Sequence, residues 1–141
     1  MEAIVPYLNF NGNAAEALAF YEKAFGGKVL FQQSFGDSPM GDQTPETHKD
    51  KVMHASFQAG ELKFMVSDTM PGQEVKPGSN LSLSLNFHSL ADIDKTFAAL
   101  SEGAQITMPL QDTFWGARFG MLTDKFGIGW MFNHDLEQKD K

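Results

Sequence analysis

The sequence has no cysteine, and Arg118 is its single arginine. Without thiols there can be no disulfides, thiolate nucleophiles, cysteine-type zinc sites or iron–sulfur clusters. The 11 basic residues are scattered among 18 acidic ones, for a net charge of −7. Because binding to nucleic acid needs a concentration of lysine and arginine that neutralises phosphates, we do not expect a nucleic-acid partner.

Long apolar runs are also missing. No run approaches the length of about 18 residues that a membrane helix needs, and Met1–Pro6 has no basic stretch leading into an apolar one. We therefore expect no membrane segment and a cytoplasmic protein. With 141 residues, 42% of them apolar and 21% charged, the chain has the composition of one globular domain of residues 1–141, built as a unit or as two halves sharing a core.

A short motif is duplicated in the chain. Leu8-Asn9-Phe10 recurs as Leu85-Asn86-Phe87, 77 positions later (85 − 8), and each copy precedes a predicted helix. Each helix starts with a pair at capping-box spacing, Asn13 with Glu16 and Ser89 with Asp92. Glycines at 26–27 and 103 predict the helix ends. The helices share one apolar spacing, carried by Ala14, Ala17, Tyr21 and Ala24, then by Leu90, Ile93, Phe97 and Leu100.

After each helix the hydrophobic period changes to two, which is typical of strands. Strands are predicted over 29–35, 52–58 and 62–68, and again over 105–111, 115–123 and 128–133. Each half thus reads as strand, helix and three strands. We predict an α+β fold of tandem βαβββ modules over 1–69 and 80–134, which form a curved mixed sheet with the helices on its convex face.

A single half of about 65 residues buries too little surface to be stable alone. We expect the halves to associate and to enclose a cavity with the sheet faces that the helices leave uncovered. Alternation along the strands places a mixture of polar and apolar side chains there, which favours a ligand cavity over a solvated sheet face. The predicted ligand-binding residues are Tyr7, Asn9, His54, Met65, Ser67, Ser84, Phe114, Arg118 and Met131.

Two of these residues have a structural alternative. His54 can bind a ligand by donating and accepting hydrogen bonds, or it can be a satisfied histidine under a loop. Arg118, flanked by glycines at 116 and 120 on its own face, can orient an anionic or carbonyl-bearing ligand. Its alternative is an ion pair with Asp68 or Asp112. The same alternation assigns Trp115 and Trp130 to the helix-packed side.

The segment 36–50 contains Pro39, Gly41 and Pro45 and has no periodicity. Loops of this length are commonly functional lids. We expect it to be either a functional lid or a disordered loop.

The paired halves, with Phe20-Tyr21 in the first helix, Gly26 after it and Asp124-x-x-Gly127 before the last strand, resemble the vicinal oxygen chelate superfamily. Glyoxalase I, extradiol dioxygenases and the fosfomycin and bleomycin resistance proteins share this fold. Two further motifs are similar to its PhnB-like subgroup, namely Tyr7-Leu8-x-Phe10-x-Gly12-x-Ala14 and Thr113-Phe114-Trp115-Gly116.

This resemblance implies a function and a homodimer. Because the superfamily commonly builds its cavities at a dimer interface, it also implies that the loop 36–50 can cross to a partner chain. Metal enzymes of the superfamily place four ligands on the first, fourth, fifth and eighth strands, which here fall near Val5, Met65, Ser82 and Met131. None of the four is a histidine or a carboxylate, the ligands that divalent metals prefer. We therefore predict a metal-independent small-molecule binding protein without a cofactor. The alternative is a lyase, isomerase or dioxygenase with a displaced metal site that uses His54 with Asp68 or Glu61; a third reading is a resistance protein that sequesters an antibiotic.

Overall fold

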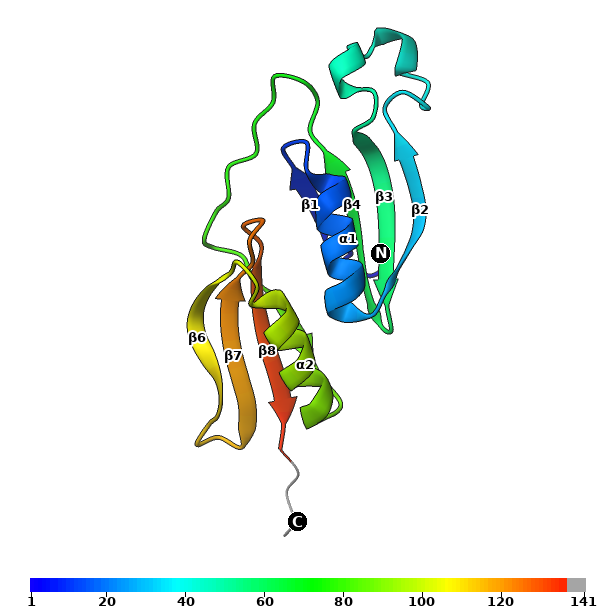
Figure 1. The fold of residues 1–141 in the computed structure, drawn as a ribbon. Helices are drawn as coiled ribbons and strands as arrows, with labels where there is room; N and C mark the ends of the chain where they lie inside the picture. Colours follow the sequence, from blue (N-terminus) through cyan, green and yellow to red (C-terminus); the bar gives the residue numbers. More distant parts are fainter. Residues whose placement is uncertain (137–141) are drawn as a thin grey trace. The chain divides into compact units, whose positions relative to one another are not determined.

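The structure is a computed structural model that describes residues 1–136. The chain divides into two compact units, Met1–Lys76 and Pro77–Lys141 (Figure 1). Within the described residues, neither helix is long and apolar enough to cross a membrane.

The first unit is a four-stranded mixed sheet with one helix on one of its faces (Figure 1). Its order in the sheet is β1-β4-β3-β2, in which β1 is parallel to β4 and the other neighbours are antiparallel. Two 3-10 helices lie between β2 and β3. The elements in chain order are β1 (Tyr7–Phe10), α1 (Ala14–Phe25), β2 (Lys28–Ser34), η1 (Gly41–Gln43), η2 (Glu46–His48), β3 (Val52–Ala59) and β4 (Leu62–Asp68).

The second unit repeats this topology with the sheet order β5-β8-β7-β6. Its single parallel pair is again the first strand with the last, β5 with β8. Its elements are β5 (Leu83–Asn86), α2 (Leu90–Leu100), β6 (Gln105–Asp112), β7 (Ala117–Thr123) and β8 (Gly129–Asp135). The predicted α+β class and the two βαβββ modules are confirmed, although β7 starts two residues later than predicted.

The duplication extends to an irregularity of the sheets. In the first sheet, the pairing of β2 with β3 shifts between Val29 and Phe31. In the second, the pairing of β6 with β7 shifts between Ile106 and Met108, again 77 positions later (106 − 29). The extra residue in each strand reverses the alternation of side chains beyond it.

Each helix packs an apolar stripe on its own sheet. In the first unit, the buried ring of Tyr21 meets Phe64 edge-on at 5.5 Å, and Phe57 stacks on Phe64 at 4.7 Å. In the second unit, Phe97 meets the buried ring of Phe132 edge-on at 4.9 Å. Burying one such side chain contributes about 1.5–3 kcal/mol, so these contacts fix which sheet face the helix covers.

The two helices begin differently. Ser89 caps α2 as predicted, because its Oγ accepts a hydrogen bond from the Asp92 amide at 3.1 Å. Asn13 makes no side-chain cap to α1, so the predicted capping box there is wrong. The Ala14 amide instead donates to Asp68 Oδ1 at 2.9 Å, and the Val52 amide donates to Asp68 Oδ2 at 2.9 Å. A buried carboxylate at the end of β4 therefore takes the place of the cap.

Candidate functional site

The face of the first sheet opposite α1 carries the candidate site. Cross-strand pairing forms one row across all four strands, in which Tyr7 pairs with Met65, Met65 with Ser56, and Ser56 with Phe31. Two residues further along β1 and β2, Asn9 pairs with Ser67 and Gln33 pairs with His54. We call this set the rear face of the first sheet: Tyr7, Asn9, Phe31, Gln33, His54, Ser56, Met65 and Ser67.

Tyr7 and His54 form the central polar contact of the rear face. The Tyr7 hydroxyl and His54 Nδ1 hydrogen-bond at 2.9 Å. The ring of His54 lies 5.7 Å from that of Tyr7 and 6.0 Å from that of Phe31, so aromatic groups flank the imidazole on two sides. Because the phenol engages Nδ1, the geometry leaves Nε2 as the imidazole atom for a further hydrogen bond.

A second polar pair lies beside it. Ser67 Oγ donates to Asn9 Oδ1 at 3.2 Å, and Ser67 is only 8% exposed. Since the Asn9 carbonyl oxygen accepts this hydrogen bond, the Asn9 amide NH2 is the group that can donate to a ligand. The rear face therefore offers a phenol, an imidazole, an amide and a hydroxyl in fixed positions.

The structure brings together five of the predicted ligand-binding residues on this face: Tyr7, Asn9, His54, Met65 and Ser67. It adds Phe31 and Gln33, which sequence reasoning missed. The bulge after Val29 shifts their alternation, and the residue types of this strand give no signal of it.

In the second unit, the face opposite α2 holds two more predicted residues. Ser84 and Met131 are direct partners across β5 and β8. Met131 also pairs with Met121, and Met121 with Met108, so three methionines cross this sheet in one row. Flexible thioethers form an adaptable apolar surface.

The predicted face of strand β7 is wrong. Pairing places Gly120 opposite Phe132 and Leu122 opposite Trp130, and both partners are buried under α2. Arg118 precedes Gly120 by two residues along β7 and therefore lies on the same, helix-covered side of the sheet. Phe119 and Met121 lie on the opposite face. The prediction failed because glycine has no side chain, so the alternation of apolar residues did not count Gly120 as a core residue. In the structure Gly120 is the core position, where a Cβ would lie 2.9 Å from Phe97 Cε2.

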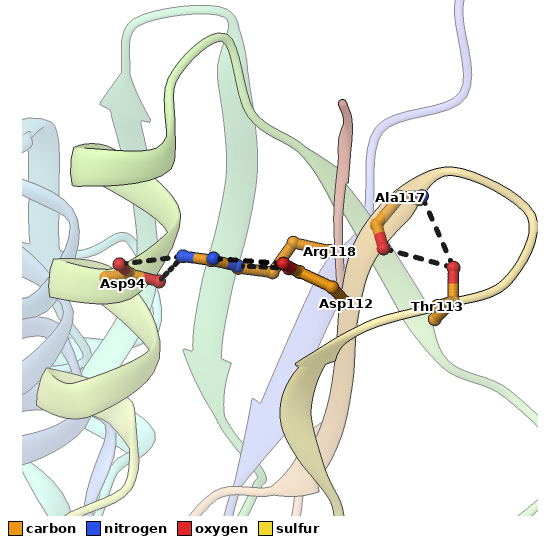
Figure 2. A network of polar contacts seen from close by, with 5 residues as sticks. All are labelled: Asp94, Asp112, Thr113, Ala117 and Arg118. Carbon is orange, nitrogen blue, oxygen red and sulfur yellow. Dashed lines mark hydrogen bonds and ion pairs between the residues drawn. The ribbon is translucent and has the colours of Figure 1, made fainter. Parts of the chain in front are cut away.

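Arg118 joins two carboxylates (Figure 2). Its Nε donates to Asp112 Oδ1 at 2.7 Å, and its Nη1 donates to both oxygens of Asp94 in α2 at 3.0 Å. The hydrogen bond from Arg118 lowers the pKa of Asp112, and the same hydrogen bonds raise the pKa of Arg118. The predicted ion-pair partner Asp112 is confirmed, Asp94 was missed, and Asp68 is not a partner. These ion pairs favour the structural alternative for Arg118 over the ligand role.

The turn between β6 and β7 carries two exposed aromatic residues. Thr113 Oγ1 donates to the Ala117 carbonyl at 3.0 Å and closes this turn (Figure 2). Phe114 is 96% exposed and Trp115 is 56% exposed, so the assignment of Trp115 to the helix-packed side is wrong. Trp130 is buried as predicted, and its indole N–H donates to Asp124 Oδ2 at 2.8 Å. Phe114 belongs to the turn and not to a sheet face.

The acidic partners considered for His54 lie elsewhere. Both carboxylate oxygens of Asp68 are engaged by amides at the start of α1 and of β3, on the helix side of the sheet. Glu61 lies in the turn between β3 and β4. The pairing of His54 with Asp68 that the enzyme alternative used is therefore wrong.

The donor set does not fit a divalent metal. The positions carried over from the metal enzymes are Val5, Met65, Ser82 and Met131. The cross-strand partners are Tyr7 and Ser56 for Met65, and Ser84 and Met121 for Met131. Thioethers and neutral hydroxyls are poor ligands for Zn²⁺, Mn²⁺ or Fe²⁺. Nowhere between residues 1 and 136 do three histidine, aspartate or glutamate side chains gather as a metal site.

The segment 36–50 is ordered against its own unit. η1 and η2 lie within it, and Ser38 and Thr44 are buried. His48 Nε2 donates to the Thr69 carbonyl at 2.9 Å, which attaches the segment to the end of β4. Crossing to a partner chain stays a prediction.

Comparison with known proteins agrees with this architecture. Residues 3–132 match the family model of the Glyoxalase/Bleomycin resistance protein/Dioxygenase superfamily. The chain belongs to this superfamily. A relative that aligns with nearly the whole chain is Protein YjdN of Escherichia coli. It is 34% identical over 91% of this chain and 92% of its own length.

Two solved structures are similar over nearly the whole chain. Protein PA1353 from Pseudomonas aeruginosa is 43% identical, with a TM-score of 0.85 over 97% of this chain and 100% of its own. A PhnB protein from Bacillus cereus, described as a putative 3-demethylubiquinone-9 3-methyltransferase, is 25% identical, with a TM-score of 0.77 over 94% of this chain and 99% of its own. The predicted likeness to PhnB-like proteins of this superfamily is confirmed.

Proposed function

We propose that this superfamily member is a metal-independent small-molecule binding protein and that the rear face of the first sheet holds the polar part of its ligand. The hydrogen bond between Tyr7 and His54 is the observation that carries the proposal. It fixes a phenol and an imidazole between aromatic and thioether side chains on a sheet face that α1 does not cover. Aromatic and thioether side chains beside polar groups in fixed positions are typical of ligand sites.

The exposed rings indicate the chemistry of the ligand. Tyr7 is 43% and Phe31 51% exposed, and both flank His54. A ligand with a flat apolar part would cover these rings, while a carbonyl or hydroxyl group would hydrogen-bond to His54 Nε2 or to the Asn9 amide. Met65 belongs to the same cross-strand row and lies in β4, between the strand of Tyr7 (β1) and the strand of Phe31 (β2). Its flexible thioether adapts to the shape of the ligand.

Of the four other predicted contacts, three are kept in the proposal and one is left out. Ser84 and Met131 are kept as ligand contacts because they face away from α2. Phe114 is kept as an exposed aromatic at the β6–β7 turn. Arg118 is left out, because both of its acidic partners already occupy its guanidinium.

Methyl transfer is not part of the proposal. The Bacillus protein is described as a putative methyltransferase. This sequence, however, contains no glycine-rich nucleotide-binding motif such as G-x-G-x-x-G. The residues of the rear face bind and orient a ligand, and none is assigned as a catalytic residue.

A fragment screen tests the binding proposal. Ligand-observed NMR with a library of aromatic ketones, phenols and amides should yield hits whose binding is lost in Tyr7→Phe and in His54→Phe. Glu16→Gln, on the exposed side of α1, is the matched control and should bind as the wild type does. Equal binding by all four proteins would overturn the proposed site.

The proposal includes a homodimer without a bound metal. Native mass spectrometry of the purified chain should report twice the monomer mass and no stoichiometric divalent ion, with elemental analysis as a second readout of the metal. A monomer would remove the dimer from the proposal, and retained metal at one equivalent after dialysis would overturn metal independence. The cytoplasmic location stays a prediction.

A further inference from the structure

The first unit contains a pocket that is separate from the rear face. It lies between the β1–α1 turn, the end of the β2–β3 connection and the segment after β4, and its volume is about 550 Å³. Pockets of this size hold small-molecule ligands. The residues that matter for its chemistry are Asn11, Gly12, His48, Lys51, Thr69 and Glu74.

Hydrogen bonds fix the walls of this pocket. Asn11 Nδ2 donates to the Val75 carbonyl at 3.0 Å, and the Val75 amide donates back to Asn11 Oδ1 at 2.7 Å. The Thr69 amide donates to the Phe10 carbonyl at 2.9 Å, and His48 Nε2 donates to the Thr69 carbonyl. Three segments that are distant in sequence are therefore tied to one another around the pocket, so its shape is set before a ligand arrives.

Lys51 supplies the charge of the pocket. Among residues 1–136, no acidic side chain forms an ion pair with the Lys51 ammonium. Its side chain lies beside Gly12, where an added Cβ would be 3.7 Å from Lys51 Cε and 3.9 Å from Lys51 Nζ. Gly12 has a φ of 92°, so glycine both permits the turn and leaves room next to the ammonium.

A lining that combines an ammonium without an acidic partner with fixed polar walls is suited to an anion. We propose that this pocket binds a small oxyanion, the phosphate or carboxylate group of a metabolite, through Lys51. The Thr69 carbonyl engages His48 Nε2, so the imidazole is positioned as a wall and Lys51 is the group that contacts the anion. Glu74 lines the same pocket with the opposite charge and weakens this binding.

The two lining charges give the proposal a directional test. Amide spectra of the ¹⁵N-labelled full chain are recorded while inorganic phosphate, and separately acetate, is added at constant ionic strength. The amides of Gly12, Lys51 and Gly72 should shift with saturation, and Lys51→Met should raise the dissociation constant about tenfold. Glu74→Gln should lower that constant, and Lys23→Met, an exposed lysine of α1, should leave it unchanged.

The comparison of the two anions identifies the preferred group. A lower dissociation constant for phosphate assigns a phosphorylated ligand, and a lower one for acetate assigns a carboxylate. Three results would overturn the proposal: no saturable shift at the pocket amides with either anion, an unchanged constant in Lys51→Met with its thermal melting preserved, or weaker binding in Glu74→Gln.

Discussion

The Arg118 guanidinium donates to both carboxylate oxygens of Asp94, with each distance at 3.0 Å. This contact ties the start of strand β7 to helix α2, and a second one, to Asp112, ties it to the neighbouring strand β6. The single arginine of the chain therefore connects three elements of the second unit at its surface.

Replacing Arg118 should change stability more than ligand binding. Arg118→Met is expected to lower the melting temperature by only a few degrees, because the ion pairs are largely solvated. Fragment binding at the rear face should be unchanged. Differential scanning fluorimetry and the fragment screen measure the two effects. An unchanged melting temperature together with lost fragment binding would restore Arg118 as a ligand residue.

The ion pair also predicts a pH dependence. Arg118 lowers the pKa of Asp112 from its ordinary value of 3.8, so this pair contributes its full stability above that value and loses it as the pH falls through the lower, folded-state pKa. Asp112→Asn should therefore melt below the wild type at pH 6, and the gap should shrink at pH 3. Asp42→Asn, an exposed acid in η1, serves as the control. A gap that is constant between the two pH values would contradict this account.

Asp68 should be more important to stability than a surface acid. Its two carboxylate oxygens accept the amides of Ala14 and Val52, and the residue is buried. Asp68→Asn replaces one acceptor with a donor that faces an amide N–H, so we expect a loss of about 2 kcal/mol in the free energy of unfolding. Ser89→Ala, the cap of α2, should cost about 1 kcal/mol. Urea denaturation measures both, and an Asp68 variant as stable as the wild type would be inconsistent with the proposed capping role.

Gly120 tests the corrected face of β7. Gly120→Ala should destabilise the chain by about 1–3 kcal/mol, because the new Cβ would lie 2.9 Å from the Phe97 ring and 3.1 Å from the Leu110 backbone. Gly78→Ala is the control, since its nearest neighbour would be 3.7 Å away. Combining Gly120→Ala with Phe97→Leu should recover part of the loss. If Gly120→Ala were neutral, residue 120 would not pack against α2.

The sequence was sufficient for the repeated architecture because hydrophobic periods and the duplicated motif recur 77 positions apart. It was also sufficient to place Tyr7, His54 and Met65 on one sheet face, because the register shift of β3 lies between Val52 and His54 and does not separate His54 from Ser56 and Met65. It failed at β7 because alternation counts apolar side chains, and the core position there is Gly120, whose lack of a side chain admits the Phe97 ring.

Two other features depend on contacts between distant residues. The bulge near Leu30 reverses the face of Phe31, and only the pairing with β3 reveals it. Asn13 has the residue type of a helix cap, but the cap comes from Asp68, 54 positions away (68 − 14) from the amide it accepts. Local propensity cannot identify a partner that the sheet supplies.

The measurement that tests the binding site most directly is the methyl spectrum of the chain labelled with ¹³C at methionine, recorded while the strongest fragment of the screen is added. Met65 lies in the central row of the rear face, whereas Met40 lies in the β2–β3 connection and reports on the rest of the unit. The Met65 methyl signal should shift with saturation, this shift should be abolished in Tyr7→Phe, and the Met40 signal should not move. A shift confined to Met40, or a Met65 shift that is identical in Tyr7→Phe, would contradict the proposed binding site.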